Sequence, residues 1–236
     1  MKLFPPPGQL WTGMLQLLYP ELCVACGQDL PFSATCFCMH CKSRLSVSDM
    51  YKCQDNEFVH RLWGRLPLQS GAAAYYFTRN SPIRHAIHHL KYRNKPEIGK
   101  ILGREFGRQL KRSADFQTID LIVPVPLHPK KERLRGYNQS AMIAQGLAEA
   151  MDVPLLNGVL VRNTHTETQT HKKRMDRFQN VDAMFGLRKP HLLAGKHILL
   201  ADDVLTTGAT LEVCGQTLLQ AEGARLSCAT IAIAAR

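Results

Sequence analysis

After residue 70, the chain alternates between short apolar runs and longer segments that have the spacing of amphipathic helices. The run Ile119–Val125 is apolar apart from Asp120, whereas a strand with one solvated face would alternate with polar residues. Strands buried on both faces and separated by helices are typical of a mainly parallel sheet covered by helices. We therefore predict an α/β fold, with its ligand outside the carboxyl ends of the strands.

This alternation also predicts where individual elements lie. Ser81 is expected to cap a helix that starts at Pro82, and a second helix is expected from Pro96 to Leu110. Glycines stand four residues apart in the second helix, at 99, 103 and 107, and each costs about 1 kcal/mol there, so another backbone should pack closely on them. The predicted strands are 71–77, 119–125, 159–162, 197–201 and 225–234; further helices begin near Gln139 and span 209–222.

The segment Ile198–Thr210, ILLADDVLTTGAT, places two carboxylates directly after a buried strand. Backbone N–H groups at the following helix start favour a phosphate dianion, and Gly208 permits close approach of the backbone. Ionised Asp202 and Asp203 only accept hydrogen bonds, which suits sugar hydroxyls or water on Mg²⁺. The segment predicts a sugar-phosphate site; a solvated acidic turn with a threonine cap is the alternative.

A second segment, 123–140, carries cations after another predicted strand. Its prolines end the strand and stiffen the exit, and a basic loop follows. Residues 135–140 precede a helix and are a second candidate for an anion-binding helix start, while a solvated basic turn is the alternative. The cations of the loop are Lys130, Lys131, Arg133 and Arg135.

Together these segments resemble a known family. Residues 198–210 resemble the phosphoribosyl-pyrophosphate (PRPP) loop of type I phosphoribosyltransferases: four hydrophobic residues, two acids, two hydrophobic residues, then T-T-G-x-T. P-V-P-L followed by R-x-R-G-[FY]-N-Q-[SA] in 123–140 is similar to the ComF (GntX-like) branch. The branch motifs L-K-[YF] and R-x-T...Q...R-x2-N match Leu90–Tyr92 and the stretch from Arg162 to Asn180.

The resemblance implies roles for these positions. In the family, the acidic pair holds the ribose 2- and 3-hydroxyls and the threonine-glycine turn holds the 5-phosphate. It implies catalytic roles for Asp202, Asp203 and Arg135. The same resemblance implies PRPP and phosphate binding, with Mg²⁺, by Asp202, Asp203, Thr206, Thr207, Gly208, Ala209, Thr210, Lys131, Arg133 and Lys91.

Residues 163–180 form a long polar and basic connection at the expected ligand end. Long charged connections of this kind are often lids over a reaction centre, and a plain surface loop is the alternative. By analogy with the fold, this stretch would be the hood loop. Its expected residues are Arg162, Thr164, Gln169 and Arg177.

Six of the eight cysteines fall between Cys23 and Cys53, and four of them form C-x2-C, eleven residues, C-x2-C. Two such knuckles supply the four thiolates of a closed tetrahedral zinc site, so Cys23, Cys26, Cys38 and Cys41 are expected to hold one structural Zn²⁺. Two disulfides or unpaired buried thiols are the alternative. Cys36 and Cys53 are left over, while Cys214 and Cys228 are expected in the core.

We expect residues 1–62 to form an N-terminal helix, over Leu10–Leu18, and a zinc-ribbon module, with a phosphoribosyltransferase-like domain at 71–236. No apolar run approaches the roughly 18 residues needed to span a bilayer, so we expect no membrane insertion. The start lacks a signal cleavage site, which favours a cytoplasmic protein, with export as the alternative.

The chain carries 30 Lys and Arg against 19 Asp and Glu, a net charge of +11, which favours anionic partners. Ten Lys or Arg and two Glu lie between Arg79 and Arg112. This stretch is either a solvated helical face or a surface for single-stranded DNA or another acidic partner.

Two functional hypotheses follow. The family resemblance implies a phosphoribosyltransferase-like protein that binds PRPP or a ribose 5-phosphate group, with a role in natural transformation beside competence-machinery proteins. The alternative is a non-catalytic single-stranded-DNA-binding accessory protein that uses the sugar-phosphate pocket as a sensor or end clamp.

Overall fold

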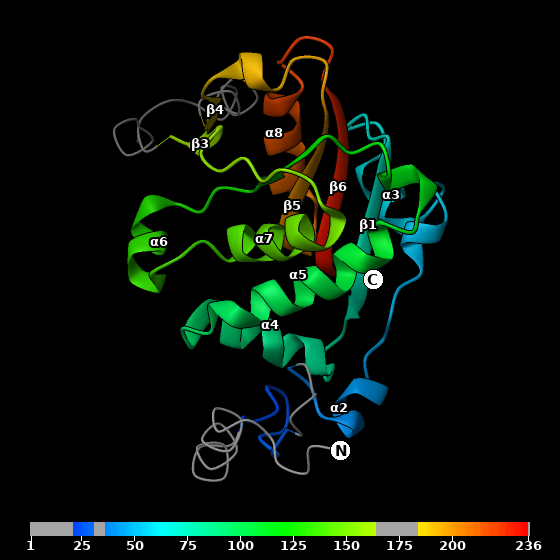
Figure 1. Cartoon of the computed structure of the whole chain (residues 1–236), viewed down its shortest axis with the longest axis vertical. Helices are drawn as coiled ribbons and strands as arrows, with labels where there is room; N and C mark the ends of the chain where they lie inside the picture. Colours follow the sequence, from blue (N-terminus) through cyan, green and yellow to red (C-terminus); the bar gives the residue numbers. More distant parts are fainter. Residues whose placement is uncertain (1–20, 31–35, 164–183, 236) are drawn as a thin grey trace, which may run out of the picture.

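A sheet of four parallel strands organises the computed structural model, which describes residues 21–30, 36–163 and 184–235. The strands lie in the order β1-β6-β5-β2 (Figure 1). Largely apolar sequence makes them buried on both faces, as predicted. Their bounds are β1 Ser70–Phe77, β2 Leu121–Pro124, β5 His197–Leu205 and β6 Arg225–Ala234.

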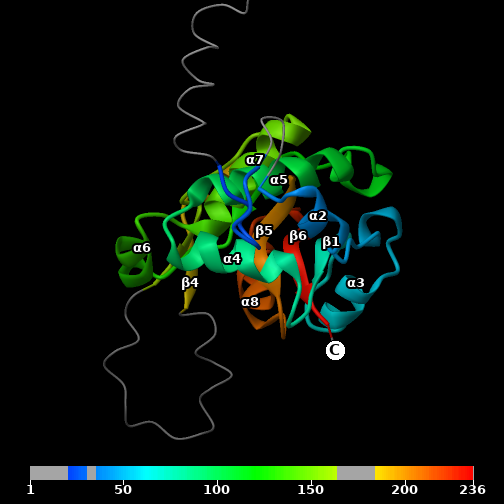
Figure 2. The same cartoon turned by 90° about the horizontal axis from the view of Figure 1, so that it is seen from below.

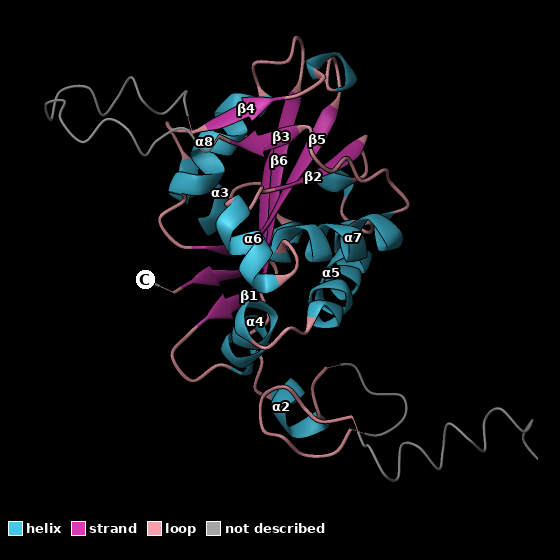
Figure 3. Cartoon of the chain, turned by 90° about the vertical axis from the view of Figure 1, so that its left-hand side faces the viewer, coloured by secondary structure: helices cyan, strands magenta, loops and turns pink. Residues whose placement is uncertain are grey.

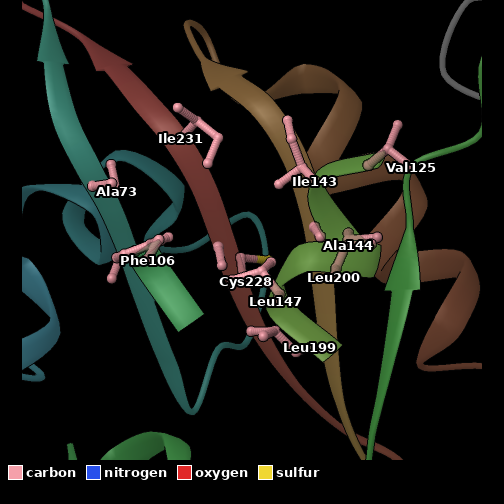
Figure 4. Close-up of a cluster of buried hydrophobic side chains, with 14 of the residues drawn as sticks. Ala73, Phe106, Val125, Ile143, Ala144, Leu147, Leu199, Leu200, Cys228 and Ile231 are labelled. Atoms are coloured by element: carbon pink, nitrogen blue, oxygen red, sulfur yellow. The ribbon is translucent and has the colours of Figure 1, made fainter. Parts of the chain in front are cut away.

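Helices cover both faces of this sheet. Figure 3 shows α5 (Pro96–Leu110) and α7 (Gln139–Met151) on one side and α8 (Ala209–Leu218) on the other. The core includes side chains from α5, α7 and three strands (Figure 4). The predicted α/β class is therefore confirmed. The helix α4 (Pro82–Tyr92) begins at the predicted proline, although the Ser81 side chain makes no capping hydrogen bond.

The glycine stripe packs as predicted. A Cβ on Gly103 would lie 2.2 Å from the carbonyl oxygen of Ile143 on α7, and one on Gly107 would lie 3.0 Å from that of Leu147. From the α7 side, a Cβ on Gly146 would lie 2.2 Å from the carbonyl oxygen of Lys100. Glycines on both helices thus allow their backbones to approach to a distance that no larger residue permits.

Two predictions of local structure are wrong. The basic stretch expected as a loop contains the helix α6 (Pro129–Arg135), because Pro129 suits the first helical position and the His128 side chain accepts a hydrogen bond from the Lys130 N–H. The strand expected to stop at residue 201 continues as β5 to Leu205, because pairing with β6 extends through Leu205 and Ile233. The acidic pair therefore lies within the strand.

A small antiparallel pair, β3 (Leu160–Arg162) and β4 (Phe185–Leu187), stands apart from the main sheet. Sequence reasoning predicted β3 but not β4. The connection between them carries most of the expected hood loop, and Thr164, Gln169 and Arg177 lie outside the described residues. Short 3-10 turns occur at Met50–Lys52, Ala114–Phe116 and Pro190–Leu192.

The N-terminal region joins the sheet at its β1 edge. Residues 46–48 pair with β1, where the Ser48 N–H donates to the Ala74 carbonyl and the Tyr76 N–H to the Ser46 carbonyl. The helix α2 (Met39–Ser43) precedes this contact, and α3 (Glu57–Leu62) lies beside β1 (Figure 2). Leu10–Leu18 lies outside the described residues. Among the helices of the described ranges, none is long and apolar enough to cross a membrane.

Candidate functional site

The two adjacent carboxylates sit at the centre of the candidate site, in the last part of β5. Asp202 is buried and its Oδ1 accepts hydrogen bonds from the Ser140 hydroxyl, at 2.7 Å, and from the Asp203 N–H, at 2.8 Å. Burial, and then the neighbouring charge of Asp203, raise the pKa of Asp202 to about 7. The start of α7, a candidate anion site, therefore faces a carboxylate of the protein itself.

Asp203 points to a different partner. Its Oδ1 lies 2.9 Å from the ammonium group of Lys91, at the end of α4, and only 7% of its side chain is exposed. Its Oδ2 is buried and has no hydrogen-bond partner in the described part of the chain. One oxygen of a buried carboxylate thus stays available for a hydroxyl, a water or a cation.

The turn after β5 carries the expected phosphate-binding residues. Gly208 has φ +83°, which favours glycine, and α8 starts at Ala209, so the turn presents a helix N-terminus. The side chains of Thr206, Thr207 and Thr210 are exposed on this turn. The carbonyls of Thr206 and Thr207 accept hydrogen bonds from arginines outside the predicted set.

Cations from two helices line a pocket beside the acidic pair. The pocket has a volume of about 430 Å³ and includes Lys91, Lys131 and Arg135, with Tyr92 and Tyr137 in its wall. The Arg135 guanidinium lies 5.2 Å from the centre of the Tyr92 ring and donates to the Gln139 amide oxygen. Lys91 belongs both to this pocket and to the acidic pair. Arg133 is exposed on α6.

A neighbouring pocket of about 540 Å³ lies between the start of α7 and the β3–β4 pair. Arg162 and Arg188 contribute to its lining, together with Asn138. The Arg162 guanidinium also lies 5.5 Å from the centre of the Phe185 ring, across the two strands. Arg162, the one described residue of those expected in a hood loop, therefore lines a pocket that shares Tyr137 with the cation pocket.

The four cysteines of the two C-x2-C pairs come together near α2. Their sulfur atoms all lie within 4.8 Å of one another, and the sulfurs of Cys26 and Cys38 are 3.6 Å apart. Tetrahedral zinc with bonds of about 2.3 Å to sulfur requires sulfur atoms roughly 3.8 Å apart. Burial opposes ionisation of Cys23, but N–H groups, foremost that of Cys38, donate to its sulfur and lower its pKa to about 6. The cluster could hold one zinc ion.

The remaining cysteines have different surroundings. Burial raises the pKa of Cys36 to about 12, and Cys53 is exposed with its thiol on the Asp55 carbonyl. Cys214 and Cys228 are fully buried, as predicted, and burial raises the pKa of both thiols. These buried thiols are inert packing groups.

Sequence reasoning missed two arginines that reach the turn. Arg61 and Arg65 donate to backbone carbonyls of the turn and lie on or just after α3, about 145 residues earlier in the chain. They also line a pocket of about 340 Å³ with Thr206 and Thr207. No spacing or motif indicated them, because their contacts depend on the packing of α3 at the sheet edge.

Comparisons with known proteins agree with this geometry. Residues 138–236, which contain the acidic pair and the turn, match the family described as the phosphoribosyl transferase domain. Competence protein F of Haemophilus influenzae is 29% identical over 210 residues, which cover 87% of each chain. Competence protein ComFC of Bacillus subtilis is 28% identical over 213 residues, 89% of this chain and 83% of that protein. These matches support a ComF-family protein with a phosphoribosyltransferase-type domain.

Other similarities of this chain are partial. The DNA utilization protein YhgH of Salmonella typhimurium is 33% identical over 142 residues, which span 59% of this chain and 62% of that protein. Among solved structures, the glutamine PRPP amidotransferase of B. subtilis, complexed with ADP and GMP, aligns with 17% identity and a TM-score of 0.44. That alignment covers 62% of this chain and 30% of the amidotransferase.

Proposed function

We propose that this protein binds PRPP, or a ligand that carries a ribose 5-phosphate group, at the carboxyl edge of the sheet. The observation that carries the proposal is the buried acidic pair at the end of β5, followed directly by the start of α8. Carboxylates accept hydrogen bonds from the ribose hydroxyls, and the N–H groups of the turn donate to the 5-phosphate. Residues 206–210 are the phosphate-binding residues in this assignment.

The cation pocket suits the pyrophosphate end of PRPP. Lys91, Lys131 and Arg135 converge there, and Lys91 links the pocket to Asp203. In phosphoribosyl transfer, the bond from ribose C1 to a pyrophosphate oxygen breaks while a bond from C1 to an acceptor forms. Cations placed at the departing oxygen stabilise the charge that develops on it, which gives Arg135 a catalytic role. These residues do not define the acceptor that would form the new bond to ribose C1.

The unpartnered Oδ2 of Asp203 also fits Mg²⁺, either directly or through a bound water. Asp202 and Asp203 carry carboxylate oxygens, which are ligands of the kind that this cation prefers. When bound with PRPP, Mg²⁺ would supply charge neutralisation of the pyrophosphate. Near α2, we propose that Cys23, Cys26, Cys38 and Cys41 hold one structural zinc ion.

The names of the relatives support a role in the handling of DNA during natural competence. Seven cations are exposed between Arg79 and Arg112: Arg79, Arg84, Arg93, Lys95, Arg108, Lys111 and Arg112. Tyr92 is 65% exposed beside Arg135, and an exposed aromatic ring among cations suits a stacked base. A second candidate function is therefore binding of single-stranded DNA on this face, with or without turnover.

Calorimetry with PRPP and Mg²⁺ tests the first proposal. We expect binding by the wild-type chain and at least tenfold weaker binding by Asp203→Asn and Thr207→Leu, because the first variant removes a charged acceptor and the second places an apolar side chain on the turn. Gln220→Leu, an exposed change at the far end of α8, should bind as the wild type does. Equal affinity of all four proteins would refute the assignment.

Fluorescence anisotropy with a labelled oligonucleotide tests the second candidate. Binding to the basic face should weaken steeply between 50 and 200 mM salt, as expected for phosphate contacts that release about 6 counterions or more. Double replacement of Arg108 and Arg112 by Gln should reduce the salt dependence. Pyrophosphate release in the presence of DNA ends or nucleobases would instead support an enzyme.

A further inference from the structure

The turn that follows β5 accepts hydrogen bonds from the segment that begins with α3. The Arg61 guanidinium donates from Nη1 to the carbonyl oxygen of Thr206, at 3.2 Å, and to that of Ala234, at 2.8 Å. Arg65 donates from Nη1 to the carbonyl oxygen of Thr207, at 2.8 Å. Two consecutive peptide groups of the turn are therefore each bound to a different arginine.

Arg61 is buried and Arg65 is partly exposed, and each arginine is paired with an acidic residue. Only 6% of the Arg61 side chain is exposed, and Glu57, one helical turn earlier, balances its charge. Glu212 on α8 balances the charge of Arg65, whose Nε lies 2.9 Å from a carboxylate oxygen of Glu212. A buried guanidinium such as that of Arg61 is costly unless it is paired and hydrogen-bonded, and the two arginines together contact two acids and four backbone carbonyls.

Leu62, which lies between the two arginines in the sequence, also contacts the turn. A Cβ built on Gly208 would lie 2.5 Å from the Leu62 Cδ2 atom, so the leucine side chain occupies the space behind the glycine. Gly208 also has the positive φ that favours glycine. The turn is thus fixed by two hydrogen bonds and an apolar contact from one short stretch of chain.

Fixing these carbonyls also fixes the N–H groups. A trans peptide is planar, and its C=O and N–H point in opposite directions. The Arg61 contact with Thr206 therefore directs the Thr207 N–H away from α3, and the Arg65 contact with Thr207 does the same for the Gly208 N–H. Both N–H groups belong to the turn that is proposed to bind the 5-phosphate.

We propose that Arg61 and Arg65 are positioning residues for the phosphate site, and that they act by holding the Thr206 and Thr207 carbonyls away from the bound phosphate. This inference rests on the proposed function. Without the arginines, either peptide could rotate and present a carbonyl oxygen to the dianion, which would repel it. A site on the 71–236 portion would then depend on residues contributed by the segment before it.

Calorimetry with ribose 5-phosphate tests this inference. Arg65 is the better target because 38% of its side chain is exposed, so its replacement should leave the core intact. We expect Arg65→Gln to weaken binding at least tenfold and Arg65→Lys to recover part of the loss, because lysine keeps a cationic donor. The double variant R65Q/E212Q should be as weak as Arg65→Gln, which shows that an unpaired Glu212 is not the cause. Arg225→Gln, an exposed change at the amino end of β6, is the control for charge and should bind normally.

A spectroscopic readout separates positioning from stability. In ¹⁵N-labelled wild-type protein, saturating ribose 5-phosphate should shift the Gly208 amide proton downfield, and Arg65→Gln should lose this shift even where the variant is folded and saturated. Suppose the wild type binds ribose 5-phosphate. If Arg65→Gln then bound it with the same affinity and showed the same Gly208 shift, the positioning role alone would be overturned. If the wild type bound neither ribose 5-phosphate nor PRPP, the proposed function and this inference would both fail.

Discussion

At the scale of single residues, the two carboxylates of the site differ in what surrounds them. Asp203 faces the Lys91 ammonium, whereas Asp202 is buried against the Ser140 hydroxyl and feels the charge of Asp203. Burial and a like charge both favour the protonated form of Asp202, and its pKa rises to about 7. The pair therefore places a carboxylate that faces a cation next to one whose ionisation costs stability.

That cost predicts a dependence of stability on pH. The pKa of Asp202 is raised in the folded state from 3.8 to about 7, so the folded chain keeps a proton that the unfolded chain has lost, and the stability contributed by this group falls as pH rises from about 4 to about 7. Asp202→Asn removes the titration. We expect urea denaturation to show that the stability of the variant relative to the wild type rises by about 2–3 kcal/mol between pH 5 and pH 8. The exposed change Glu222→Gln is the control.

The same substitution should weaken PRPP binding at least tenfold, since Asn lacks the charge that accepts ribose hydroxyls. A variant that gains stability but loses binding identifies a residue that serves function and lowers the stability of the folded protein. A constant difference in stability across the pH range would show that Asp202 is not perturbed.

At the scale of elements, the contact between α5 and α7 supports the helix that carries Ser140. Gly103 meets a backbone carbonyl of α7, whereas a Cβ on Gly99 would lie 2.9 Å from the Cβ of Met142 and 3.2 Å from the Leu90 side chain. The carbonyl at Gly103 lies 2.2 Å away and cannot move aside without separating the helices, whereas the closest approach at Gly99 is 2.9 Å, so a smaller shift of α7 relieves it. The two glycines therefore differ in what they tolerate.

We expect Gly103→Ala to destabilise the fold by about 2–3 kcal/mol, because the overpacking cost exceeds the roughly 1 kcal/mol that alanine gains in a helix. Gly99→Ala should cost less and provides the matched comparison. Chemical denaturation of both variants checks the order. Equal or improved stability of Gly103→Ala would mean that the helices do not cross at this distance.

Elements with a strong periodic signal could be predicted from the sequence, and the glycine spacing also predicted the close helix contact. The helix α6 could not, because its seven residues show no buried face and its start depends on a histidine cap. At the site, the acidic pair and the turn form one continuous segment and were predictable. Ser140 was part of a predicted anion site, but its hydroxyl donates to Asp202. Arg61 and Arg65 contact residues about 145 positions later in the chain, and no local sequence pattern predicts such contacts.

At the scale of the whole molecule, the N-terminal region makes two separate contacts with the sheet. Residues 46–48 extend the β1 edge through backbone hydrogen bonds, and α3 reaches the turn through Arg61 and Arg65. The cysteine cluster lies beyond the first of these contacts, in the region of α2 (Figure 1). A change at the cluster should therefore loosen the residues around it before it disturbs the turn after β5.

Removal of zinc tests this arrangement. Structural zinc supplies folding free energy to the small module it holds, since short loops around four cysteines bury little apolar surface by themselves. We expect Cys38→Ser to reduce the zinc content of purified protein from about one ion per chain to near zero. Hydrogen exchange should then accelerate over residues 21–30 and 36–45, while the amides of β5 and β6 keep their protection because the sheet is paired independently of the cluster. Cys53→Ser, an exposed cysteine outside the cluster, should keep both the zinc and the protection. Zinc retained by Cys38→Ser would contradict the four-cysteine site, and exchange that accelerated equally in β5 would show that the cluster and the sheet fold as one cooperative unit.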